Sequence, residues 1–84
     1  MNLLFSEEAA SLASHIETSA YLAPGELVST APLFSAGIID SMSLIELIAF
    51  TEKRFDIRVP AEDITLDNWD SLERILAYIA RKRG

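Results

Sequence analysis

The segment Gly37–Met42 holds the residues of this chain whose types and spacing are best suited to chemistry. Its sequence is Gly-Ile-Ile-Asp-Ser-Met, and an apolar helical run follows it directly. This order places the hydroxyl of Ser41 at the start of a helix, beside the carboxylate of Asp40. A lone hydroxyl at such a position does little chemistry by itself, but it is well placed for covalent modification. Ser41 is therefore a candidate attachment site.

Catalysis by Ser41 itself is disfavoured by the rest of the sequence. The G-x-S-x-G pattern of α/β-hydrolases is absent. The single histidine, His15, lies in a different predicted helix, and nothing in the sequence brings it to Ser41. The chain has no cysteine, which excludes a Cys-type zinc site, and one histidine argues against a histidine metal cluster. The sequence therefore predicts neither a catalytic nor a metal site.

Helices and one long loop are the elements expected to position Ser41. A first helix is predicted from about Ser6 to Ala20, because a serine cap and two acidic residues open it. A loop from about Tyr21 to Asp40 follows, and loops of this length often have a role. Leu33 and Phe34 are apolar residues within this loop. We expect these two side chains to fix the loop to the core.

The second half of the chain also reads as helical. The second helix is predicted over Ser41–Phe55 with Asp40 as its N-cap. A short turn or helix is predicted over Pro60–Ile64. The last helix is predicted to start near Asp70, with Asp70 as its cap and Glu73 completing a capping box. Because no alternating strand pattern occurs, we expect an all-α fold, a small bundle of three main helices and one short one.

The length and hydropathy of the chain limit its class. Eighty-four residues, half of them apolar, suit one compact domain spanning residues 1–84. No apolar run approaches the roughly 20 residues of a membrane span. The first residues carry no basic side chain, which argues against a signal peptide. We therefore expect a cytoplasmic protein, and from its size and acidity a monomer.

Charge is distributed unevenly along the sequence. Residues 1–52 contain seven acidic residues and no lysine or arginine, whereas residues 53–84 contain seven basic and six acidic ones. The net charge of −6 disfavours nucleic-acid binding, because phosphate is repelled. A basic protein partner is favoured instead. The alternative, that the charge only maintains solubility, remains open.

The second predicted helix carries two apolar stripes. At about 100° per residue, one stripe is expected to face the core; it contains Leu44, Leu47, Ile48, Thr51 and Phe55. The other stripe lies about a third of a turn away and is flanked by Glu46 and Glu52; it contains Met42, Ile45 and Ala49. Either the helix is buried on both sides, or the second stripe is an exposed strip for docking a partner.

The segment Leu33–Met42 resembles the attachment segment of acyl and peptidyl carrier proteins. In that family a glycine, two apolar residues and Asp-Ser lead into the second helix. The resemblance continues through Glu46–Ile48, Glu52, Phe55–Ile57, Val59–Pro60, Glu62–Ile64 and Asn68–Leu72. Met42, Trp69 and the Val-Pro pair resemble stand-alone D-alanyl and other aminoacyl or peptidyl carriers.

The resemblance implies a four-helix bundle of the acyl-carrier type and a non-catalytic carrier function. It implies that Ser41 receives a 4′-phosphopantetheine arm from coenzyme A through a phosphopantetheinyl transferase, with Asp40 assisting that enzyme. The arm would hold an acyl or aminoacyl group as a thioester. The implied partners are an adenylating enzyme and downstream transferases or synthases, docked at Met42, Ile45, Glu46, Ala49 and Glu52. The alternative is an unmodified helical adaptor that uses the same helix only for docking.

Overall fold

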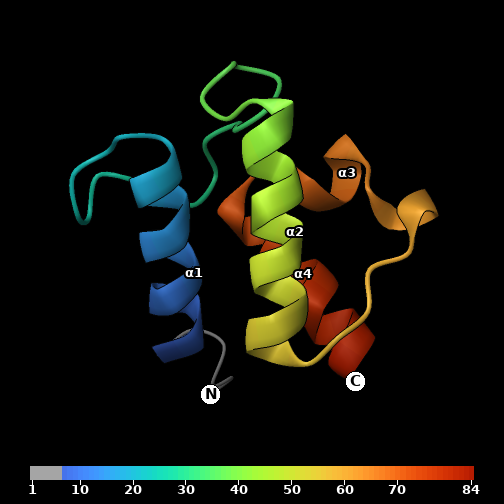
Figure 1. The fold of residues 1–84 in the computed structure, drawn as a ribbon. Coiled ribbons are helices and arrows are strands. Elements are labelled where there is room, and N and C mark those ends of the chain that lie inside the picture. The colour runs from blue at the N-terminus through green and yellow to red at the C-terminus, as the bar shows by residue number, and fades with distance from the viewer. Residues whose placement is uncertain (1–6) are drawn as a thin grey trace.

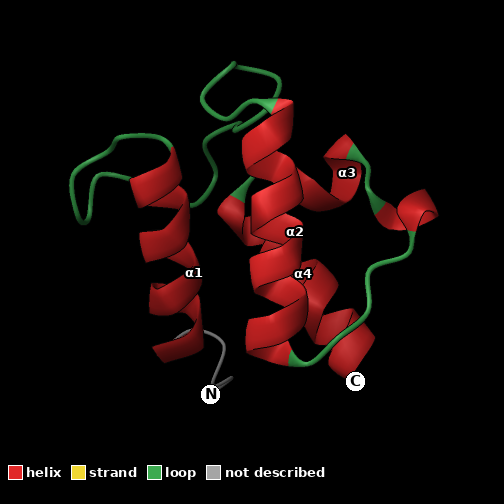
Figure 2. Ribbon diagram, in the orientation of Figure 1, coloured by secondary structure: helices red, strands yellow, loops and turns green. Residues whose placement is uncertain are grey.

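The computed structural model describes residues 7–84, which form α-helices joined by loops and one 3₁₀ turn (Figure 1, Figure 2). In chain order the elements are α1 (Glu7–Ser19), α2 (Ser41–Phe55), η2 (Ala61–Asp63), α3 (Leu66–Trp69) and α4 (Leu72–Arg83). Residues 7–84 contain no strand. The all-α fold with four helices is therefore confirmed. The serine cap predicted at Ser6 lies outside the described residues.

The helices are arranged so that the start of α2 lies at one end of the molecule. α1 and α2 run antiparallel, and α1 contacts both α2 and α4, whereas α3 contacts α4 (Figure 1). The long loop between α1 and α2 passes over the end at which α1 finishes and α2 begins (Figure 2). The bundle therefore presents Ser41 at the loop end, away from the C-terminus of α4.

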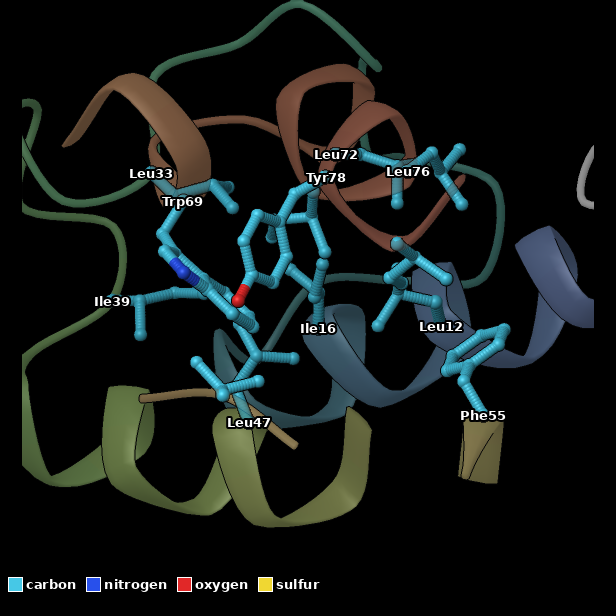
Figure 3. Close-up of a cluster of buried hydrophobic side chains, with 13 residues drawn as sticks. Leu12, Ile16, Leu33, Ile39, Leu47, Phe55, Trp69, Leu72, Leu76 and Tyr78 are labelled. Atoms are coloured by element: carbon cyan, nitrogen blue, oxygen red, sulfur yellow. The ribbon is translucent and has the colours of Figure 1, made fainter. Parts of the chain in front are cut away.

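The core is built from apolar faces of the three longer helices together with residues of the loops. Figure 3 shows side chains of α1, α2 and α4 gathered in one cluster, which also contains Trp69 at the end of α3. The most deeply buried apolar residues are Leu12, Ile16, Leu33, Leu47, Trp69, Ile75 and Ile79. Leu33 is fully buried and Phe34 packs partly buried against the same cluster. The expected anchoring of the loop to the core is thus confirmed.

A buried carboxylate organises the first part of the long loop. Glu17 accepts hydrogen bonds from the backbone N–H groups of Gly25 and Leu27, both at 3.0 Å. Further along, the carbonyl of Ser29 accepts from the N–H of Glu73 at the start of α4, at 2.9 Å. Backbone groups of the loop therefore have hydrogen-bond partners in two helices, α1 and α4.

The region before α4 differs from the sequence prediction. The short turn predicted near Pro60 is present as η2, but the structure adds α3, which begins after the extended residue Thr65. Trp69 terminates α3, and its indole Nε1 donates to the carbonyl of Asp63 at 3.1 Å. This contact, formed only after the chain folds back, stabilises a helix of four residues that is too short to form alone.

The predicted cap of α4 is also wrong. Ser71, not Asp70, is the N-cap, and its hydroxyl accepts from the N–H of Arg74 at 3.1 Å. Asp70 instead hydrogen-bonds the loop before α2. The sequence offers Asp and Ser side by side, and both are good caps. Tertiary contacts of Asp70 decide which of the two performs the capping.

Candidate functional site

Ser41 is the first residue of α2 and its side chain is exposed. Asp40 caps the helix as predicted: its backbone is extended, with φ of −93°, and its carboxylate accepts from the N–H of Ser43 at 2.9 Å. This backbone hydrogen bond, followed by one from the Ser43 hydroxyl, lowers the pKa of Asp40. An ionised carboxylate therefore adjoins the hydroxyl at the positive end of the α2 dipole.

A tight loop leads the chain into α2. The carbonyl of Leu33 accepts from the N–H groups of both Ile38 and Ile39, at 2.8 and 3.0 Å. Gly37 turns the chain with a φ of +74°, a conformation that favours glycine. Ile39 is buried, whereas Ile38 remains 38% exposed beside the site. The loop thus anchors one isoleucine in the core and delivers Asp40 and Ser41 to the surface.

A largely apolar cavity of about 470 Å³ opens beside Ser41. The loop before α2, the first turn of α2 and the segment from Ile64 to α3 line it. The lining residues are Phe34, Gly37, Ile39, Asp40, Ser41, Leu44, Ile64, Thr65, Leu66 and Trp69. Trp69, whose indole donates to the carbonyl of Asp63, forms part of this wall. Leu44 and Ile64 line the cavity, whereas Phe55 is buried in the core.

The second apolar stripe of α2 faces solvent. Met42 is 68% exposed, Ile45 is 61% exposed, and Ala49 is also exposed. The helix is therefore not buried on both sides. Glu46 is exposed along this strip, whereas Glu52 is half-buried and accepts from the N–H of Val59 at 2.8 Å. Glu52 thus fixes the loop after α2, a structural contact that the sequence did not indicate.

His15 is separate from the Ser41 site. Its ring stacks on Phe50 of α2 with centroids 4.3 Å apart, and its Nε2 is buried without a hydrogen-bond partner. Burial lowers the pKa of His15, although the charge of Glu46 acts in the opposite direction. Because Nε2 bonds no hydroxyl, the structure gives no support to a hydrolytic pairing of His15 with Ser41.

Among residues 7–84, no group of three or more histidine, aspartate or glutamate side chains is arranged to hold a metal ion. None of the helices in the same range is both long and apolar enough to cross a membrane.

Comparison with known proteins places this geometry in a family. Residues 10–79 match the family described as "Phosphopantetheine attachment site". The chain belongs to this family. Members are non-catalytic carriers, and membership indicates a 4′-phosphopantetheine prosthetic group. The carrier family predicted from the sequence is therefore confirmed.

Named relatives of this phosphopantetheine-attachment domain are D-alanyl carrier proteins. Those of Streptococcus sanguinis, Streptococcus gordonii and Streptococcus thermophilus are each 43% identical to this chain over 52 residues. The matched stretch covers 62% of this chain and 66% of each relative, just under two thirds of their length. The resemblance to D-alanyl carriers noted in the sequence is thus confirmed at this level of identity.

Asp70 is the residue near the site whose position the sequence did not reveal. Its carboxylate accepts from the N–H groups of Phe34 and Ser35 at 2.7 and 3.0 Å, and from the Ser35 hydroxyl at 2.6 Å. Burial opposes ionisation, but the bonds from Ser35 and Phe34 outweigh it and lower the pKa of Asp70. The only available signal was the Asp-Ser pair itself, which offers two caps for one helix.

Proposed function

We propose that this chain is a carrier protein whose 4′-phosphopantetheine arm is attached to Ser41. The observation that carries the proposal is the exposed serine at the first position of α2, at the rim of an apolar cavity, in a chain of the phosphopantetheine-attachment family. When bound, the arm supplies the terminal thiol that this cysteine-free chain lacks, and that thiol holds an acyl or aminoacyl group as a thioester.

The residues around Ser41 suit such an attachment. A phosphodiester on its hydroxyl would lie at the N-terminus of a 15-residue helix, where free N–H groups and the dipole favour an anion. Asp40 already satisfies the N–H of Ser43 and keeps the first turn of α2 ordered. Its carboxylate, which stays ionised at neutral pH, is available to a modifying enzyme and its metal ion.

The exposed strip of α2 is the proposed docking surface. Its apolar members are Met42, Ile45 and Ala49, and Glu46 and Glu52 border it. Exposed apolar side chains beside carboxylates suit an enzyme with a basic rim around an apolar contact. The proposed partners are a phosphopantetheinyl transferase, an adenylating enzyme and downstream transferases or synthases.

The cargo proposed is an acyl or aminoacyl group, and the similarity to D-alanyl carrier proteins supports the aminoacyl branch. We further propose that residues 1–84 act as a single domain, as a monomer and in the cytoplasm. The acidic net charge of −6 supports a role with protein partners rather than nucleic acid.

Intact-mass measurement after incubation with coenzyme A and a broad-specificity phosphopantetheinyl transferase tests the proposal. A gain of about 340 Da is expected from the arm. Ser41→Ala abolishes the gain, whereas Ser43→Ala, two residues along the same helix, retains it. Absence of the gain in the native chain would instead support an unmodified adaptor that only docks through α2. Persistence of the gain in Ser41→Ala would refute attachment at Ser41.

A further inference from the structure

A hydrogen-bonded latch joins the residue before α4 to the loop before α2. One oxygen of Asp70 accepts from the backbone of Phe34 and Ser35, and the other accepts from the Ser35 hydroxyl. The carbonyl of Asp70 also accepts from the N–H of Leu33, at 2.7 Å. Three consecutive loop residues are therefore bound by one aspartate about 35 positions further along the chain.

The latch extends to the candidate attachment site through a short series of backbone bonds. Leu33, bound by Asp70, accepts from the N–H groups of Ile38 and Ile39. Ile39 is buried at 4% exposure and directly precedes Asp40, which caps α2. Displacement of Leu33 would therefore move the residues that place Ser41.

The carboxylate of Asp70 is buried, and the bonds that satisfy it all come from one loop. Asp70 is only 9% exposed, and no salt bridge between described residues involves it. A buried carboxylate without a cation costs free energy unless hydrogen bonds satisfy it. Here every such bond to its side chain comes from the loop that leads to Ser41. Bonds to an ionised acceptor are short and strong, so they select one loop conformation.

We propose that Asp70 is a positioning residue for the reaction at Ser41, holding the Leu33–Ile39 loop in the one conformation that presents the serine to the modifying enzyme. This inference rests on the proposed attachment at Ser41. It follows that a molecule in which the Asp70 latch is broken binds the transferase poorly. The apparent affinity for the transferase is then proportional to the fraction of molecules in which the latch is closed.

The test compares priming kinetics and amide hydrogen exchange in three variants of the full chain. Asp70→Ala removes all three side-chain bonds. Asp70→Asn keeps an oxygen for the two backbone N–H groups and an amide for the Ser35 hydroxyl. Ser71→Ala is the matched control, because it removes the cap of α4 one residue away and leaves the latch intact. All measurements are made where every variant is folded by circular dichroism.

We expect the loop of the Asp70→Ala variant to be closed in about a tenth of molecules or fewer. The kcat/KM for priming of this variant should then fall by about tenfold or more, mainly through a higher KM. Exchange of the Ile38 and Ile39 amides should accelerate, although their own acceptor is unchanged, while amides of α2 stay protected. Asp70→Asn should keep most of the native kcat/KM for priming and most of the native protection of the Ile38 and Ile39 amides. Ser71→Ala should lose stability without changing the loop amides or the KM.

Native-like priming and exchange in Asp70→Ala would overturn the inference. So would an equal loss of priming in Asp70→Ala and Ser71→Ala, because that would show a general effect of stability. If the native chain itself accepts no arm, the proposed function fails and the positioning role fails with it. Priming of the native chain together with an unaffected Asp70→Ala refutes only the positioning role.

Discussion

Substitution of two α2 residues that lie two positions apart separates docking from folding. Ile45 is 61% exposed on the outer strip, whereas Leu47 is 1% exposed in the core. Replacing each by aspartate introduces the same charge into the same helix. We expect Ile45→Asp to leave the fold intact and to weaken reactions with partner enzymes, and Leu47→Asp to prevent folding.

The magnitudes follow from the burial of each side chain. A domain of 84 residues has an unfolding free energy of roughly 4–12 kcal/mol. Removing Leu47 from the core costs about 2–3 kcal/mol, and burying a carboxylate there costs several kcal/mol more. Ile45→Asp should change stability by no more than about 0.5 kcal/mol, because the site is on the surface.

Urea denaturation followed by circular dichroism, combined with the priming assay, measures both effects. If Ile45 contributes about 2 kcal/mol to the free energy of docking, Ile45→Asp lowers kcat/KM for priming about 30-fold. The urea midpoint of denaturation should stay unchanged. Loss of helical signal in Ile45→Asp would show that Ile45 is a core residue. Unchanged priming with intact folding would show that the strip does not dock the transferase.

Two further predictions concern the loop and α1. Gly37→Ala should lower the free energy of unfolding by about 1 kcal/mol, because the φ of Gly37 is +74°, which strains a residue with a Cβ. No clash adds to this cost, since no atom lies within 4 Å of an added Cβ. An unchanged thermal midpoint would show that the loop relaxes freely. The pKa of His15 is lowered in the folded state, so the folded state favours the neutral ring. The contribution of His15 to the free energy of unfolding is therefore fully present above pH 6.5 and is lost as the pH falls below that value. Urea titrations at pH 7.5 and 5.5 should show this loss in the native chain and a smaller one in His15→Phe, and equal losses in both would refute the assignment to His15.

The sequence alone determined the features that depend on neighbouring residues. Asp40 is a cap because its side chain reaches an N–H three residues along, which holds for this order of residues in almost any fold. The two apolar stripes of α2 follow from helical periodicity, so the burial of Leu47 was predictable. The exposure of Ile45 was one of two alternatives that the sequence left open, and the structure decided it. The attachment motif at Ser41 is likewise contiguous, which is why the family was recognisable.

Tertiary structure decided the contacts between residues that are distant in the sequence. Asp70 and Ser71 are equally good caps, and the choice was made by a loop about 35 residues away whose N–H groups needed an acceptor. α3 forms because Trp69 finds the Asp63 carbonyl, and Glu52 is held by the N–H of Val59 beyond the end of its own helix. Local propensity fixes which residues can form a helix or a cap. The pairing of buried polar groups, which must all be satisfied together, fixes which of those possibilities the folded chain uses.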